Sequence, residues 1–181
     1  VPLGVVFVSG SNGKSTTTHM LVAVLRAHGV KVFSNPTGAN LPQGIASAML
    51  ASVPLSGRLS EDVAVLEIDE AFGDRLARQL SPHSVLLINV QVDQLNRFHE
   101  PARVVAMLES FARVATQHLV INADDHNLVD LAHRLAGGPA TQSAFAASPA
   151  LLAAGPAWLA RGDNPALAMA TEQSEATVVV E

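Results

Sequence analysis

The chain has 181 residues, 49% of them hydrophobic, and a formal net charge of -5 at pH 7. This length favours one domain with a substantial core, and the lack of a basic tract argues against a nucleic-acid partner. Cysteine is absent, which excludes disulfides, thiolate zinc sites and a cysteine nucleophile. No apolar run reaches the ~20 residues of a membrane span, so we expect no transmembrane segment.

The first feature along the chain is a strand, loop and helix pattern over residues 5–18. An apolar, β-branched run leads into a turn with two glycines, and a lysine and hydroxyl residues precede a segment of helical periodicity. Glycines let backbone N–H groups approach a phosphate, and a helix N-terminus adds its positive end. A full Walker pattern would have glycine where Val8 stands, so the loop is a shortened one. We therefore predict a nucleotide-binding loop made of Gly10, Ser11, Asn12, Gly13, Lys14, Ser15 and Thr16.

Strands and helices continue to alternate after this helix, which should end at the glycine signal His28-Gly29. Apolar runs predict strands over residues 30–34, 63–68, 84–89 and 118–121, and helical periodicity predicts helices over residues 43–53, 72–80, 101–112 and 127–136. This alternation is typical of an α/β, P-loop NTPase-like, doubly wound and mainly parallel sheet, which binds ligands at the carboxyl ends of its strands. After Pro139 the pattern leaves short edge strands and a loosely packed flank as alternatives.

An acidic segment follows the third predicted strand. Glu67 ends that strand, where a carboxylate would face the phosphate loop and could hold magnesium, while Ser15 would supply a hydroxyl ligand. The alternative is a surface acid in a strand-to-helix turn. Asp69 and Glu70 lie alongside, and for each of them ligand and surface acid remain equally open.

Polar residues also leave the next two strands. Asn89 and Asp93 follow the fourth strand, which suits substrate or metal positioning, although a solvated loop is the alternative. Asn122 and Asp124 follow the fifth strand, where an amide and a carboxylate could hydrogen-bond a base or ribose. A helix N-cap formed by Asp124 or Asp125 is the alternative there.

Five segments carry a family resemblance through their order along the chain. They are Gly10-Ser11-Asn12-Gly13-Lys14-Ser15-Thr16-Thr17, residues 35–44, Glu67-Ile68-Asp69-Glu70, residues 89–97 and Asn122-Ala123-Asp124-Asp125. With these segments the chain resembles the central ATPase domain of the Mur ligases. Within that family it looks most like the MurT type, the ATP-dependent subunit of lipid II isoglutaminyl synthase.

The resemblance implies a cytoplasmic ATP- and Mg²⁺-dependent ligase. ATP would phosphorylate a carboxylate, the D-glutamate of a lipid-linked peptidoglycan precursor in the MurT type, and ammonia from a glutaminase partner would attack the acyl phosphate. By match to the family, Lys14 and Glu67 are the catalytic residues: Lys14 holds the terminal phosphates, and Ser15 and Glu67 hold magnesium. Asn122 and Asp124 would lie toward the nucleoside. Asn40, Asn89 and Asp93 would belong to the substrate loop.

Departures from the family pattern keep other functions open. Glu109 stands where many Mur ligases have a carbamylated lysine, residues 92–99 differ from the MurT pattern, and the cysteines of its zinc ribbon are missing. A catalytically reduced ATP-binding module and a ligase that adds an amino acid are the alternatives. We expect residues 1–181 to be a single central ATP-binding domain cut from a longer chain, without the C-terminal ligase domain.

Overall fold

The computed structural model describes residues 1–55, 57, 59–91 and 101–146. Its centre is a six-stranded sheet with the order β2-β3-β1-β4-β5-β6. Each neighbouring pair of strands is parallel. The strands are β1 (Val5–Ser9), β2 (Val32–Ser34), β3 (Val63–Glu67), β4 (Ser84–Leu87), β5 (His118–Asn122) and β6 (Thr141–Phe145). The predicted doubly wound parallel α/β fold is therefore confirmed.

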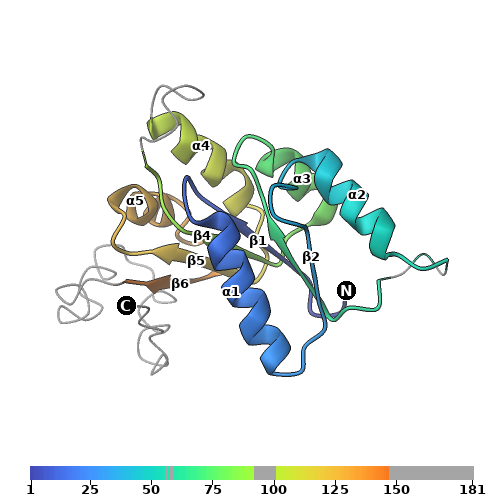
Figure 1. The fold of residues 1–181 in the computed structure, drawn as a ribbon. Coiled ribbons are helices and arrows are strands. Elements are labelled where there is room, and N and C mark those ends of the chain that lie inside the picture. The colour runs from blue at the N-terminus through green and yellow to red at the C-terminus, as the bar shows by residue number, and fades with distance from the viewer. Residues whose placement is uncertain (56, 58, 92–100, 147–181) are drawn as a thin grey trace.

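In the described part of the chain, five helices connect the strands. They lie on both faces of the sheet (Figure 1). They are α1 (Lys14–Ala27), α2 (Pro42–Ser52), α3 (Gly73–Leu80), α4 (Pro101–Ala112) and α5 (His126–Arg134). Right-handed crossovers require α1 to lie on one face, because the chain moves outward from β1 to β2, and α2 to α5 to lie on the other. Since β1 has β3 on one side and β4 on the other, the strand order reverses beside β1, where such sheets bind ligands.

Two element boundaries show where the sequence pattern was ambiguous. We predicted a strand from residue 30, but β2 begins at Val32. The Val30 N–H donates to the Leu25 carbonyl at 3.1 Å, so this residue belongs to the turn that closes α1. Gly29 has φ 80° in that turn, as a glycine helix end requires. After Pro139, where the alternatives were open, β6 forms an edge strand paired to β5.

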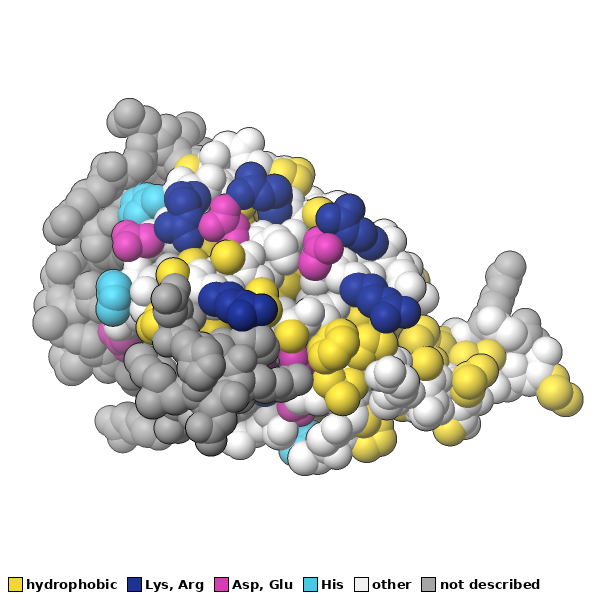
Figure 2. All heavy atoms as spheres, turned by 90° about the horizontal axis from the view of Figure 1, so that it is seen from above, with side chains coloured by type: hydrophobic (Ala, Val, Ile, Leu, Met, Phe, Trp, Pro, Cys, Tyr) yellow, Lys and Arg dark blue, Asp and Glu magenta, His cyan; other side chains and the backbone are white. Residues whose placement is uncertain are grey.

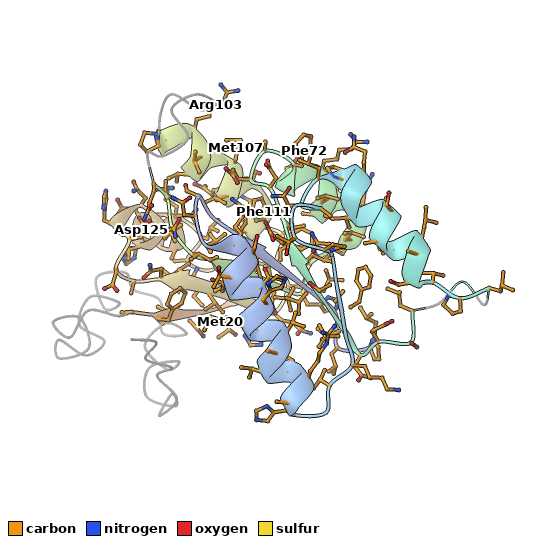
Figure 3. The ribbon with its side chains drawn as sticks, in the orientation of Figure 1. Met20, Phe72, Arg103, Met107, Phe111 and Asp125 are labelled. Carbon is orange, nitrogen blue, oxygen red and sulfur yellow. The ribbon has the colours of Figure 1, made fainter. Side chains whose placement is uncertain are left out.

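The sheet separates two hydrophobic clusters, because successive residues of a strand point to opposite faces. Phe7 belongs to the larger cluster, with side chains from α3, α4 and α5, and Val8 belongs to the smaller cluster with Val22 of α1. Phe7 and Phe111 meet edge to face with ring centroids 6.3 Å apart, and Figure 3 shows Phe111 on α4. All of Phe7, Val8 and Phe111 have 0% exposure, so β1 is covered on both faces.

The outer face of α3 to α5 carries arginines interspersed with acids (Figure 2). Arg78 pairs with Asp74 on α3, and Glu109 of α4 pairs with both Arg113 and Arg134. Each exposed pair contributes only about 0–1 kcal/mol. In the described part of the chain, no helix has the length and apolar character that crossing a membrane requires.

We predict that Gly73→Ala destabilises the fold, since a Cβ at this position would lie 2.1 Å from Cδ1 of the Phe111 ring. Overpacking of this kind costs about 1–3 kcal/mol, which thermal or denaturant unfolding would measure. The same substitution in a Phe111→Leu background should cost less, because the smaller side chain leaves room. Equal costs in both backgrounds would contradict the steric explanation.

Candidate nucleotide-binding site

The predicted phosphate loop lies between the end of β1 and the start of α1. Gly10 has φ 141° and Gly13 has φ 79°, a region that other residues rarely adopt. A Cβ at Gly10 would lie 2.9 Å from the backbone oxygen of Asn89, so this glycine also permits a close approach of two strands' ends. The first amides of α1 have no intrahelical partner and carry the positive end of the helix dipole. This end of α1 is therefore suited to a phosphate.

Asn89, just beyond β4, holds the loop in place. Its carbonyl accepts from the Ser11 N–H at 2.9 Å. Its side chain accepts from the Asn12 N–H at 2.9 Å and donates to the Asn12 carbonyl at 3.0 Å. Gln91 adds a bond from its backbone N–H to the Ser11 hydroxyl at 2.9 Å. The amides of Ser11 and Asn12 are thus engaged in supporting the loop, which leaves the amides at the start of α1 for a ligand.

The side chain of Lys14 folds back over the loop. Its ammonium donates to the carbonyls of Gly10 at 2.6 Å and Ser11 at 3.1 Å, and to the Glu70 carboxylate at 3.3 Å. Only 11% of the Lys14 side chain and 1% of the Glu70 side chain are exposed. Glu70, for which ligand and surface acid were left open, is therefore a buried acidic partner of the loop lysine.

Glu67 lies beside this loop, at the end of β3 and opposite Val8 of β1. Asn35 brackets its backbone, accepting from the Glu67 N–H at 2.9 Å and donating to the Glu67 carbonyl at 3.0 Å. The Asn40 side chain donates to the Glu67 carboxylate at 3.4 Å. Asn40, which was predicted to belong to the substrate loop, thus contacts the candidate metal ligand directly. Glu67 is buried, with 4% of its surface exposed.

The segment after Glu67 is tied to β1 and carries two more buried acids. The Ser9 hydroxyl donates to the Ile68 carbonyl at 2.9 Å, and the Asp69 N–H donates to the Asn40 carbonyl at 3.1 Å. Asp69 and Glu70 are 5% and 2% exposed, so neither is the surface acid that remained an alternative. Asp69 accepts from the Ala71 N–H at 3.0 Å, which shapes the turn into α3.

The oxygen donors near the loop fit a magnesium ion better than a transition metal. Among the described residues, no group of three or more His, Cys, Asp or Glu side chains could enclose a metal. Mg²⁺ does not need such a cage, because it usually binds one or two carboxylates and keeps waters and substrate phosphates as its other ligands. Glu67 and the half-buried Ser15 at the first turn of α1 are of the right chemical type. Their role as ligands stays a prediction.

Asn122 ends β5, and Asp124 lies in the turn between β5 and α5. The Asn122 side chain accepts from the Asp124 N–H at 2.9 Å, and Asp124 is exposed. Asp125 caps α5 by accepting from the Asn127 N–H at 3.0 Å, and it also accepts from the Val90 N–H at 2.5 Å. The N-cap alternative is therefore correct for Asp125, seen at the start of α5 in Figure 3. A nucleoside contact by Asn122 or Asp124 stays a prediction.

The structure places the predicted loop between β1 and α1, and it also shows supporting residues that were not predicted. Glu70, Asn35 and Gln91 contact site residues and were not among the predicted ones. Glu70 had a signal, the acidic run after Glu67, but nothing in the run tells which acid reaches Lys14. Asp93 lies outside the described residues, so its predicted role stays untested by the structure.

Comparison with known proteins gives consistent similarities. The family model described as "Mur ligase middle domain" matches residues 8–150. The MurT subunit of lipid II isoglutaminyl synthase (glutamine-hydrolyzing) from Streptococcus pneumoniae is 36% identical over 121 residues, 66% of this chain and 27% of that protein. The UDP-N-acetylmuramate–L-alanine ligase of a Nocardioides species is 33% identical over 137 residues, 74% of this chain and 28% of that protein. The chain thus spans about a quarter of the length of these curated relatives.

Solved Mur ligases share the fold at lower identity. MurF from Thermotoga maritima, in complex with ADP, aligns with a TM-score of 0.63 and 21% identity, covering 79% of this chain and 32% of that one. MurF from Acinetobacter baumannii aligns with a TM-score of 0.65 and 18% identity, covering 80% and 31%. The family model, which matches well over half of the residues, decides the classification. The chain belongs to the Mur ligase family, as a middle domain with the predicted phosphate loop at the end of β1.

Proposed function

We propose that this chain is the ATP-binding domain of an amide ligase that amidates the D-glutamate of the lipid II stem peptide. The observation that supports this most directly is the 36% and 34% identity to MurT subunits from two bacteria. A phosphate loop with a buried lysine and three buried acids beside it is the site such a reaction needs. By the same similarity, a glutaminase subunit would supply the ammonia, and the reaction would take place in the cytoplasm.

The proposed chemistry has two steps. A carboxylate oxygen of the D-glutamate attacks the terminal phosphorus of ATP, which forms an acyl phosphate and releases ADP. Ammonia then attacks the acyl carbon, the phosphate leaves, and the nitrogen loses a proton to give the amide. Phosphoryl transfer of this kind depends on positioning and charge neutralisation more than on covalent chemistry by the protein.

The residues of this chain would bind and orient the nucleotide. Lys14 would turn from its present partners to the terminal phosphates, and the free amides at the start of α1 would bind the same groups. Glu67 and Ser15 would hold magnesium, which neutralises phosphate charge when it is bound. Asn122 and Asp124 would lie toward the nucleoside. The acceptor and ammonia would bind at the carboxyl ends of β3 and β4, where Asn40, Asn89 and Asp93 would line the substrate loop.

The middle domain supplies one part of the proposed enzyme. We infer that residues 1–181 form a single ATP-binding domain of a longer protein, and that a C-terminal ligase domain completes the site. The 27% coverage of the MurT relatives supports this division. The chain alone should therefore bind ATP but turn over little or no substrate.

A ligase that adds an amino acid is the second candidate. It is favoured by the 33% identity to UDP-N-acetylmuramate–L-alanine ligase over 137 residues. The two candidates share the acyl phosphate and differ in the nucleophile and the acceptor, so a single assay separates them.

We predict that ADP release by the full-length protein requires lipid II together with ammonia or a glutaminase and glutamine. UDP-N-acetylmuramate with L-alanine should give no release above background. Release with the second pair alone would favour the amino-acid ligase. If neither pair causes ADP release and the protein still binds ATP, the remaining function is that of a catalytically reduced ATP-binding module.

Removal of the Glu67 charge should slow the reaction much more than it weakens nucleotide binding. Loss of a single electrostatic stabiliser costs about 10²–10³-fold in rate, and we expect Glu67→Gln to lower turnover by this factor. Glu61→Gln is the matched control, because Glu61 precedes β3 and lies at the opposite end of the strand from the loop. Parental turnover by Glu67→Gln would contradict the metal role.

Lys14→Ala should instead weaken binding itself. A charge-assisted hydrogen bond is worth about 1.5–3 kcal/mol, so we expect about a 10- to 100-fold loss of affinity for ATP with Mg²⁺ in calorimetry. Substitution of the other lysine, Lys31→Ala, is the control, since Lys31 is exposed just before β2. Equal affinity of Lys14→Ala and the parent would place the nucleotide elsewhere.

Asn89→Asp should loosen the phosphate loop, because Asn89 supports Asn12 through two hydrogen bonds. The carboxylate cannot donate to the Asn12 carbonyl, so the 3.0 Å bond would become a repulsion between two oxygens. We expect a loss of about 1–3 kcal/mol in stability, the cost of an unsatisfied partner. A lower ATP affinity should accompany it in calorimetry, and ATP binding at parental strength would show that the loop needs no such support.

A further inference from the structure

The loop and its neighbour Glu70 accept all of the hydrogen bonds that Lys14 can donate. A lysine ammonium has three donors. Two are taken by the carbonyls of Gly10 and Ser11, and the third by the Glu70 carboxylate at 3.3 Å. Lys14 can donate to a phosphate only if one of these three hydrogen bonds breaks. Glu70 is the charged partner among the three, so it is the one that competes with a phosphate as an anion for this lysine.

Glu70 is held at this position by the chain around it. The segment is fixed on one side by the Ser9 hydroxyl bond to the Ile68 carbonyl, and on the other by the Asp69 N–H bond to Asn40. Glu70 is 2% exposed, so its carboxylate has little water to replace Lys14 as a partner. Its charge therefore stays near the loop after the lysine has moved to a phosphate.

We propose that Glu70 is the counter-ion of Lys14 and that it makes nucleotide binding depend on a divalent cation. The inference rests on the proposed function, because it assumes that ATP binds at this loop. Metal-free ATP would bring several negative charges beside the buried acids Glu67, Asp69 and Glu70, and would also separate Glu70 from its lysine. A bound cation offsets that repulsion, so the site accepts the nucleotide with its metal and rejects it without.

Neutralising Glu70 removes both obstacles for metal-free ATP. Glu70→Gln keeps the shape of the side chain but no longer competes as an anion for Lys14 or repels a phosphate. Like charges at short range in a partly buried site interact strongly, and we expect about a tenfold or larger gain in affinity for metal-free ATP. With Mg²⁺ present the affinity should change by less than about threefold, since the cation already compensates the charge.

The test is calorimetric titration of the protein with ATP, in EDTA and in excess Mg²⁺, for the parent and Glu70→Gln. Glu61→Gln makes the same chemical change at the other end of β3 and should leave both affinities as in the parent. A loss of Mg²⁺-ATP affinity in Glu70→Gln without a gain in EDTA would make Glu70 a metal ligand and overturn the proposal. No change in either condition would overturn it too.

A second measurement on the parent does not depend on the folding of a variant. The chain has two lysines, Lys14 and Lys31, so selective ¹³C,¹⁵N-lysine labelling gives two side-chain signals in NMR. The Lys14 signal should move with Mg²⁺-ATP and stay in place with the same concentration of ATP in EDTA. Equal movement in both conditions would contradict the role of Glu70. If neither condition moves the signal and calorimetry shows no binding with Mg²⁺, the proposed function itself fails.

Discussion

The position of β1 between β3 and β4 determines what the loop at its end can contact. Because the three strands are parallel, their carboxyl ends meet at one edge, and the chain leaving each of them enters the same space. β3 brings Glu67 and the acids after it to one side of the loop, and β4 brings Asn89 to the other. The phosphate loop thus has acidic side chains after β3 on one side and the neutral, hydrogen-bonding Asn89 on the other. The order of the strands determines both neighbours.

Charge balance at this edge explains why the lysine is folded back. Three buried acids follow β3 beside a loop that has one lysine and a helix N-terminus, so acidic groups outnumber basic ones there. The Lys14 ammonium offsets the negative charge of Glu70 in this ion pair, and the carboxylate accepts from the third N–H of the ammonium. A nucleotide and its cation would bring both signs of charge, and so could replace this pairing without leaving a buried ion alone.

The sequence allowed the sheet and the loop to be predicted, because both have local signals. The run 5–8 is apolar on both faces, as a central parallel strand requires, and the glycines and Lys14 follow at once. The contacts that complete the site come from residues up to 80 positions apart, such as Ser11 with Gln91. No periodicity reports a contact of that range. For the same reason the sequence could not tell whether Asp69 or Glu70 contacts Lys14, because the two acids are adjacent in the chain.

Two asparagines, one on each side of the loop, share a physical role that a charged residue could not fill. Asn35 after β2 bonds both the N–H and the carbonyl of Glu67, and Asn89 after β4 does the same for Asn12. A side-chain amide has the donor and acceptor of a peptide group, so each asparagine adds one more rung beyond the end of a strand. An aspartate would lack the donor and add a negative charge where three acids are already buried. The neutral amide fixes the backbone of the metal ligand candidate and of the phosphate loop, and leaves the electrostatic balance to Lys14, Glu70 and the bound ligand.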